Sequence, residues 1–326
     1  MPTADSQSSD FLRTLATERV ILSEGSMYER LRRLPGARFD AAVAQAAMVF
    51  DPPSRQALEQ AHREYLDIGR AHRLPMVALT DTWRANRERI ERSRFAGEDV
   101  NGECARLLCE LRDELASTAA PVFVGGLLGP KGDAYTPGQA PPTDEAESFH
   151  SYQVEKLAGT EVDFLKASTL PSVAEAIGLA QAMSRAPLPY FLSFVIRSDG
   201  TVLDGTPLGQ AFDRIDQTVA APPAGYYVNC VHPSIMLTAL EAFRLNSEHA
   251  DFLDRLVGFH ANTSARSPEE LDALADIETE DPRRYATMMR EIHERHGLKI
   301  LGGCCGSGPE HIEYLARELR GSISKF

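Results

Sequence analysis

The sequence has few cysteines, no long apolar run and no excess of basic residues, and each shortage excludes a class of protein. Five cysteines among 326 residues are too few for a disulfide framework. No apolar stretch approaches the roughly 18 residues that suggest a membrane span. The chain carries 34 basic and 47 acidic residues, a net charge of −13. We therefore expect no membrane and no nucleic acid among its partners, since phosphates require a basic surface.

The first residues of the sequence do not have the pattern of a secretory signal. Residues 1–10 are polar and lack the basic start and apolar middle of a secretory signal. We expect residues 1–18 to be a flexible leader and the protein to be cytoplasmic. In a reducing compartment, clustered cysteines bind metal or do chemistry more often than they form disulfides.

Short β-branched or apolar runs alternate with helix-length segments along the rest of the chain. This alternation predicts parallel strands, and eight is the number that closes a (β/α)₈ TIM barrel. We expect one barrel domain over residues 19–326. The predicted strands are 19–24, 75–80, 121–126, 162–167, 190–197, 226–230, 255–261 and 298–303. The predicted helices are 54–73, 101–118, 144–158, 172–184, 233–245 and 281–296, with Ser54 and Ser172 as N-caps.

A doubly wound open sheet is the alternative architecture. It usually has a glycine-rich phosphate turn after its first strand, and EGSM at residues 24–27 is not one. Long inserts follow the third predicted strand, at 127–143, and the seventh, at 262–281. In a barrel, both inserts fall on the face that holds the active site.

Three cysteines stand at the ends of predicted strands. Cys304 and Cys305 are adjacent in a glycine frame, GGCCG, just after the last strand, and Cys230 ends the sixth. Glycine permits the tight turn that would aim both sulfurs into one site. Three thiolates would leave zinc one open position, as in catalytic sites, and soft sulfur favours zinc over magnesium or calcium. From the residues alone, a zinc site and a Cys304–Cys305 disulfide both stay open.

The other two cysteines call for a simpler interpretation. Cys104 and Cys109 are five residues apart on a predicted helix, so they do not share a face. We expect them to be small buried apolar side chains.

The cysteine segments resemble the homocysteine S-methyltransferase family, and the similarity runs from about residue 20 to residue 320. The paired cysteines with a separate Asn-Cys are specific to that family, and the other motifs follow in the family's order. These segments are TDTW at 80–83, LGPKGD at 128–133, DGTVLDG at 199–205, VNC at 228–230 and GGCCG at 302–306.

The resemblance implies a fold, a metal and a reaction. The family's fold is a (β/α)₈ barrel, and its cysteines matching Cys230, Cys304 and Cys305 bind Zn²⁺, which binds a homocysteine thiol. The implied reaction moves a methyl group from S-methylmethionine, S-adenosylmethionine or betaine to that thiol and gives methionine. The family's betaine users tend to carry an extra C-terminal arm, and because this sequence ends about twenty residues after the cysteine pair we expect a sulfonium donor.

The sequence departs from the family where the amino-acid end of homocysteine would bind. Glu24 stands where the family has Asp, and Ser168 stands where it has Glu. In the family these two acids resemble a clamp for the ammonium group. The seventh-strand Pro-Asn motif is also missing, and Asn262 is the candidate for its polar role.

Several further residues have both a functional and a structural interpretation. Thr82 would donate to a substrate carboxylate or cap a helix, and Trp83 would face a donor cation or pack in the core. His232 would support the metal ligands or simply begin a helix. The alternatives for the whole protein are a different thiol or selenol acceptor, a non-catalytic zinc protein, and a redox protein using a Cys304–Cys305 disulfide.

Overall fold

The computed structural model describes residues 4–117, 119–245, 252–266 and 279–323. Eight parallel strands close into a barrel, each paired with the next in sequence, and β8 pairs with β1 through Leu22 and Leu301. The strands are β1 (Ile21–Ser23), β2 (Met76–Leu79), β3 (Val122–Leu128), β4 (Phe164–Leu170), β5 (Tyr190–Phe194), β6 (Gly225–Val231), β7 (Leu256–Ala261) and β8 (Ile300–Gly303). The predicted barrel is confirmed, and the open sheet is excluded because no strand edge is left unpaired.

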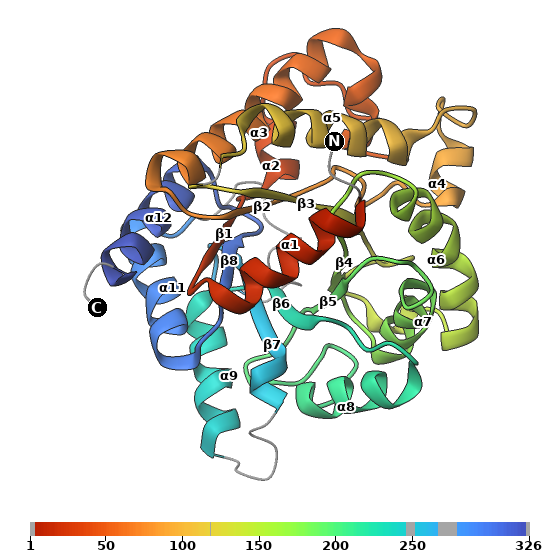
Figure 1. Ribbon diagram of the computed structural model, residues 1–326. Helices are drawn as coiled ribbons and strands as arrows, with labels where there is room; N and C mark the ends of the chain where they lie inside the picture. Colours follow the sequence, from red (N-terminus) through yellow and green to blue (C-terminus); the bar gives the residue numbers. More distant parts are fainter. Residues whose placement is uncertain (1–3, 118, 246–251, 267–278, 324–326) are drawn as a thin grey trace.

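Helices surround the barrel and connect successive strands (Figure 1). The main helices are α1 (Ala4–Thr17), α3 (Pro52–His72), α5 (Val100–Leu115), α6 (Thr143–Ala158), α7 (Val173–Met183), α8 (Leu208–Thr218), α9 (Pro233–Leu245), α11 (Pro282–His296) and α12 (Pro309–Ile323). Shorter turns are α2 (Met27–Arg32), α4 (Arg87–Arg92), η1 (Gln45–Phe50) and η2 (Pro137–Gln139). Among the described residues, no helix combines the length and the apolar character that crossing a bilayer would need.

The two predicted N-caps have different outcomes. The Ser172 hydroxyl accepts a hydrogen bond from the Ala174 N–H, as expected at the start of α7. The prediction for Ser54 is wrong, because α3 is capped by Asp51, which accepts from the Ser54 N–H. Pro52 and Pro53 therefore fill the first turn, where a missing N–H does not weaken the helix.

Residues expected to form a flexible leader instead include a helix that packs against the barrel. Helix α1 lies across the end of the barrel opposite to the strands' carboxyl ends (Figure 1). Phe11 is fully buried there, stacked on Phe164 at 4.4 Å between ring centroids and in contact with Phe123 and Phe191. Helix α1 thus closes the amino-terminal end of the barrel with an aromatic plug. The polar residues around Phe11 gave no sign of this role in the sequence.

Candidate functional site

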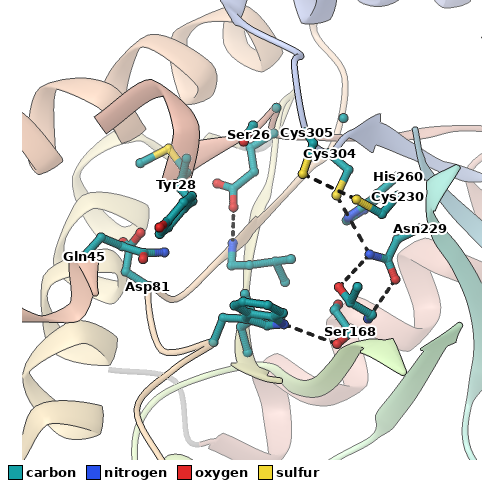
Figure 2. Close-up of a pocket in the computed structure, with 18 of the residues that line it drawn as sticks. Ser26, Tyr28, Gln45, Asp81, Ser168, Asn229, Cys230, His260, Cys304 and Cys305 are labelled. Atoms are coloured by element: carbon teal, nitrogen blue, oxygen red, sulfur yellow. Dashed lines mark hydrogen bonds between the residues drawn. The ribbon is translucent and has the colours of Figure 1, made fainter. Parts of the chain in front are cut away.

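A pocket opens at the carboxyl ends of the strands, the face on which barrel enzymes hold their active sites. The space between its walls is about 840 Å³ when the open mouth is counted. Figure 2 shows Tyr28, Gln45 and Asp81 on one side of this pocket and the three cysteines on the other.

The three predicted cysteines meet at one end of the pocket. Their sulfur atoms all lie within 4.8 Å of one another, and the Sγ atoms of Cys230 and Cys305 are 3.4 Å apart. All three are free thiols. Hydrogen bonds from Cys230 and Cys305 hold the pKa of Cys304 well below the ordinary value, while hydrogen bonding to Cys230 and to Cys304 raises the pKa of Cys305. The cluster thus stabilises a thiolate even before any metal is considered.

This arrangement fits a zinc ion. With Zn–S bonds of about 2.3 Å, three sulfurs in tetrahedral positions stand about 3.8 Å apart. The sulfur separations here, from 3.4 Å up to at most 4.8 Å, span that value. Cys230, Cys304 and Cys305 are therefore able to hold zinc and leave its fourth position facing the pocket that they line.

Left-handed backbone at two strand ends shapes the cysteine side of the pocket. Cys230 has φ +58° and Thr169 has φ +65°, conformations that non-glycine residues rarely adopt. The Asn229 side chain supports the backbone at Thr169, since it accepts from the Thr169 N–H and donates to the Thr169 hydroxyl, each at 2.9 Å. Such strain persists only where surrounding contacts hold it, and it is common at functional sites.

The glycine frame of the vicinal pair has a steric reason. A Cβ on Gly303 would come within 2.0 Å of the Ser307 Oγ, and one on Gly302 within 2.6 Å of the Ser23 Cβ. Gly306 has φ +80°, and its N–H donates to the carboxylate of Glu29. The glycines thus let the chain turn tightly against β1 and carry two sulfurs into the pocket.

Tyr135 is a site residue that the sequence did not identify. It comes from the insert after β3 and places its hydroxyl 3.0 Å from the Cys230 Sγ. The predicted position of that insert on the active-site face is the one signal that pointed toward it.

On the opposite side, a buried histidine lies between two carboxylates. His62 Nε2 is 2.8 Å from Asp81 Oδ2, and His62 Nδ1 is 3.5 Å from Glu24 Oε2. Burial opposes the charging of His62, but Asp81 and Glu24 outweigh it and raise its pKa to about 10. Burial raises the pKa of Glu24, which also accepts from the Leu79 N–H. Glu24 and Asp81 line the pocket, whereas His62 lies behind them.

Ser168 and Trp83 complete the wall between these two sides. The Ser168 Oγ is buried and has no hydrogen-bond partner in the described part of the chain, while its carbonyl accepts from Trp83 Nε1 at 3.3 Å. The Arg84 guanidinium stacks on the Trp83 ring at 4.1 Å from its centroid. One face of the indole is therefore already covered, and the ring also lines the pocket.

Beneath the pocket lies a buried amine. Lys166 Nζ is 2.9 Å from His260 Nδ1 and 4.2 Å from the centre of the Tyr227 ring. Burial lowers the pKa of Lys166 to about 7, and burial with the nearby lysine lowers that of His260 well below its usual value. A charged Lys166 can only donate a hydrogen bond, so His260 Nδ1 accepts it and the His260 proton lies on Nε2. That Nε2 atom has no hydrogen-bond partner among the described residues.

Three candidates from the sequence do not line the pocket. The Thr82 hydroxyl donates to the Leu127 carbonyl at 2.6 Å, and Asn262 accepts from the Ser264 N–H at 2.6 Å. His232 Nδ1 accepts from the Ser234 N–H at the start of α9, which matches the helix-entry interpretation. The Thr82 hydroxyl is thus bonded to the end of β3, 45 positions along the chain, and the Asn262 side chain to its own loop.

The remaining cysteines lie elsewhere in the molecule. Cys104 and Cys109 are buried on α5 within the apolar layer between barrel and helices, as predicted. Most of the seventh-strand insert, residues 267–278, lies outside the described residues.

Comparison with known proteins adds an independent line of evidence. The sequence model described as homocysteine S-methyltransferase matches residues 21–319. An S-methylmethionine–homocysteine S-methyltransferase of Pongo abelii is 26% identical over 94% of this chain and 80% of its own length. A homocysteine S-methyltransferase of Bacillus subtilis is 22% identical, covering 93% and 95%. A betaine–homocysteine S-methyltransferase of Mus musculus is 28% identical over 81% of this chain but 64% of its own length.

The solved structures point to the same architecture. The homocysteine methyltransferase of Escherichia coli in its oxidized form superposes with a TM-score of 0.74, at 19% identity, over 94% of this chain and 98% of that one. Its metallated form superposes with a TM-score of 0.71. At this identity the likeness shows a shared barrel fold.

Proposed function

Because this chain belongs to the homocysteine S-methyltransferase family and is a methyltransferase, we propose that it methylates a thiol bound to zinc at Cys230, Cys304 and Cys305. The default acceptor is homocysteine, which would become methionine. The methyl donor would be a small sulfonium or ammonium compound such as S-methylmethionine, S-adenosylmethionine or betaine. A reducing compartment such as the cytoplasm would keep the three cysteines reduced.

The observation that carries this proposal is the convergence of three free thiols on one end of a small-molecule pocket. Held by three thiolates, a zinc ion would keep a fourth position for the acceptor sulfur and would keep that sulfur deprotonated. Asn229 and Tyr135 hold the cysteine side in place through their contacts with Thr169 and the Cys230 sulfur.

The reaction needs little acid–base help from the protein. A bond forms between the acceptor sulfur and the methyl carbon while the donor's C–S or C–N bond breaks, and the leaving group departs as a neutral thioether or amine. A cation and a thiolate thus react to give neutral products, which an apolar wall favours over water. Met27, Leu79 and Leu127 supply that wall, and the uncovered part of the Trp83 ring would attract the donor cation.

A different thiol or a selenol is the second candidate acceptor, because Ser168 stands where the family has an acid. Its unpartnered hydroxyl still offers one hydrogen bond but no charge. Among the substrate contacts suggested by the sequence, we keep Glu24 and Ser168, which line the pocket, and assign Thr82 and Asn262 to loop positioning.

The proposal is tested by metal analysis together with methyl transfer. The purified protein should contain about one zinc per chain and should move a trideuteromethyl group from a labelled donor to homocysteine, as followed by mass spectrometry. A panel with S-methylmethionine, S-adenosylmethionine and betaine identifies the donor, and a panel of thiols and selenols identifies the acceptor. Removing zinc with a chelator should abolish transfer, and adding zinc should restore it. Undiminished transfer by zinc-free protein would overturn the proposal.

A further inference from the structure

One buried polar side chain on the wall opposite the cysteines is left without a partner in the described part of the chain. Gln45 lines the pocket and is 6% exposed. Its side-chain amide makes no hydrogen bond with any described residue. Figure 2 shows it near Tyr28 and Asp81, across the pocket from Cys304 and Cys305. Buried amides are normally bonded, so an unpartnered amide in a pocket wall indicates a ligand that both accepts and donates hydrogen bonds.

The backbone before Gln45 is held in a rare conformation. Ala44 has φ +53°, which residues other than glycine seldom adopt. Its backbone pairs with that of Asp40 through two hydrogen bonds of 3.0 and 3.1 Å. The Asp40 carboxylate in turn accepts from the N–H groups of Ala42 and Val43. Such strain persists only where surrounding contacts impose it, and it is common where a chain holds a ligand.

The residues after Gln45 fix the same segment to the helices around the barrel. Ala46, Ala47 and Met48 of η1 are fully buried, and η1 packs against α3 and α5. The Ala46 carbonyl accepts from the Cys104 thiol on α5 at 3.7 Å. The Gln45 amide is therefore presented by a rigid frame, and a group that is already in place loses little entropy when it binds a ligand.

The rest of the pocket wall determines which charges a ligand can bring to this side. The described residues that line the pocket include no lysine and no arginine, but they include the carboxylates of Glu24 and Asp81. The one histidine among them, His260, lies on the cysteine side (Figure 2). Burying a carboxylate without a cation beside it is costly. A ligand that places a carboxylate near Gln45 must therefore carry its own cation next to it.

This requirement separates the two kinds of methyl donor. In betaine the quaternary ammonium is the reacting centre, and it loses its charge when the methyl group leaves, so the carboxylate stays behind uncompensated. A sulfonium amino acid has a second cation, the α-ammonium, which remains beside the carboxylate throughout the transfer. The pocket therefore suits the sulfonium amino acid better.

In-line transfer places the rest of the donor on the Gln45 side. The attacking sulfur is bound at the cysteine end, and the methyl carbon lies about 3–3.5 Å from it in the reactive geometry. The bond that breaks points directly away from the attacking sulfur. The leaving group therefore extends toward the opposite wall, where Figure 2 shows Gln45 and Tyr28.

We infer that Gln45 binds the amino-acid head of the methyl donor, and that this donor is a sulfonium amino acid such as S-methylmethionine. The Gln45 amide N–H donates to the donor's carboxylate, and the amide oxygen accepts from the donor's ammonium. Gln45 thus determines specificity and takes no part in the bond changes, in which the C–S electron pair stays on the departing thioether. The inference rests on the proposed function and names the donor's class.

The test measures donor binding without turnover. Trp83 is the only tryptophan in the sequence and lines the pocket, so its fluorescence reports a bound donor. The zinc-loaded protein is titrated, without any acceptor thiol, with S-methylmethionine, with betaine, and with dimethylpropylsulfonium, which lacks the amino-acid head. The wild type should bind S-methylmethionine about ten- to a hundredfold more tightly than dimethylpropylsulfonium, as expected for hydrogen bonds to charged groups. Betaine should bind more weakly than S-methylmethionine.

Three variants locate the source of this preference. Gln45→Met keeps the length of the side chain without its donor and acceptor, so the preference should disappear while dimethylpropylsulfonium binds as before. Gln45→Glu adds a charge that repels the donor's carboxylate, so it should also lose the preference, and it replaces Gln45→Met if that variant does not fold. Gln181→Met is the matched control. Gln181 on α7 also has an amide oxygen without a partner among the described residues, but it lies outside the pocket, so the preference should persist.

A kinetic measurement assigns Gln45 to one substrate. In the methyl-transfer assay, Gln45→Met should raise the KM for S-methylmethionine and leave the KM for the thiol unchanged. A rise in the KM for the thiol instead would place Gln45 at the acceptor and overturn the inference.

The remaining outcomes separate the inference from the proposed function. Equal binding of S-methylmethionine and dimethylpropylsulfonium by the wild type, or a preference that survives in both Gln45 variants, overturns the inference and leaves the proposed function intact. Betaine binding as tight as that of S-methylmethionine, and lost in Gln45→Met, assigns the amide to a carboxylate alone and overturns the donor class. A wild type that transfers a methyl group from no donor to any thiol overturns the proposed function and the inference together.

Discussion

Asn229 and Thr169 hold each other through two hydrogen bonds of 2.9 Å that pass over the end of β5 and join β6 to β4. Ser193 on β5 donates to the same Asn229 oxygen at 2.6 Å. Because Asn229 precedes Cys230 directly, this bridge fixes the backbone of one sulfur and the strand end that presents Ser168. The Asn229–Thr169 pair therefore connects the backbone at Cys230 with the strand end at Ser168, and both residues line the pocket.

Replacing Asn229 by alanine should loosen that link. The Thr169 N–H would lose its acceptor in a buried place, which costs about 1–3 kcal/mol of unfolding free energy. Urea denaturation of the variant measures this cost. Ser193→Ala removes a single partner of the same oxygen and should cost less, about 1 kcal/mol. An Asn229→Ala variant as stable as the wild type would show that the strained backbone needs no such support.

Cys304→Ser should remove both the metal and the activity. A serine hydroxyl is a poor zinc ligand compared with a thiolate, and two cysteines would be left to hold the ion. Zinc content and methyl transfer should fall together, by more than tenfold. Cys109→Ala, which changes a buried cysteine on α5, should keep both. Activity in a zinc-free Cys304→Ser protein would refute the assigned role of the cluster.

Gly303→Ala should disturb the metal site through backbone geometry alone. The added methyl group would stand 2.0 Å from Ser307 Oγ and 2.6 Å from its Cβ, so the turn that carries Cys304 must shift. We expect weaker zinc binding in a competition titration with a chelator. Adding Ser307→Gly to the same chain removes the nearest atoms and should restore part of the affinity. Equal zinc affinity in Gly303→Ala and the wild type would contradict this account of the glycine frame.

Lys166 should make the stability depend on pH. Burial lowers its pKa from 10.5 to about 7, so between pH 7 and 10.5 the unfolded chain binds more protons than the folded chain. The wild type should therefore gain stability relative to Lys166→Met as pH rises through this window. Below pH 7 both states are protonated, and the buried charge should make the wild type the less stable of the two. The measurement is the difference in unfolding free energy from pH 6 to pH 10, and a constant difference would contradict the shift.

Phe11→Ala should test the aromatic plug at the amino-terminal end of the barrel. Phe11 is fully buried against three phenylalanines, and truncating such a side chain costs about 3–5 kcal/mol. Leu12, its neighbour on the same helix, is 39% exposed, and Leu12→Ala should cost less than about 1 kcal/mol. Similar denaturation midpoints for the two variants would mean that α1 contributes little to the fold.

The sequence by itself determined the barrel and the meeting of three cysteines at one rim of it. Alternation of apolar runs with helical segments is a local property, and it predicts parallel strands whose ends share one rim. Cys230 and the Cys304–Cys305 pair could be placed on that rim because each directly follows a predicted strand. Ser172 was found as a cap for the same reason, since capping depends on residues one turn apart.

Only the tertiary structure decided the rest of the pocket. His62 lies in the middle of α3, Tyr135 in a long insert and Lys166 within a strand, and no spacing relates them to their partners. Their importance comes from burial and from contacts between residues 19 to 95 positions apart, such as His62 with Asp81 and Tyr135 with Cys230. Thr82 and Asn262 show that polar residues at strand ends also bond to backbone groups, the first to one 45 positions away on β3 and the second to one two positions away in its own loop. The charge of a buried group is set by all its neighbours in space, and that information exists only once the chain has folded.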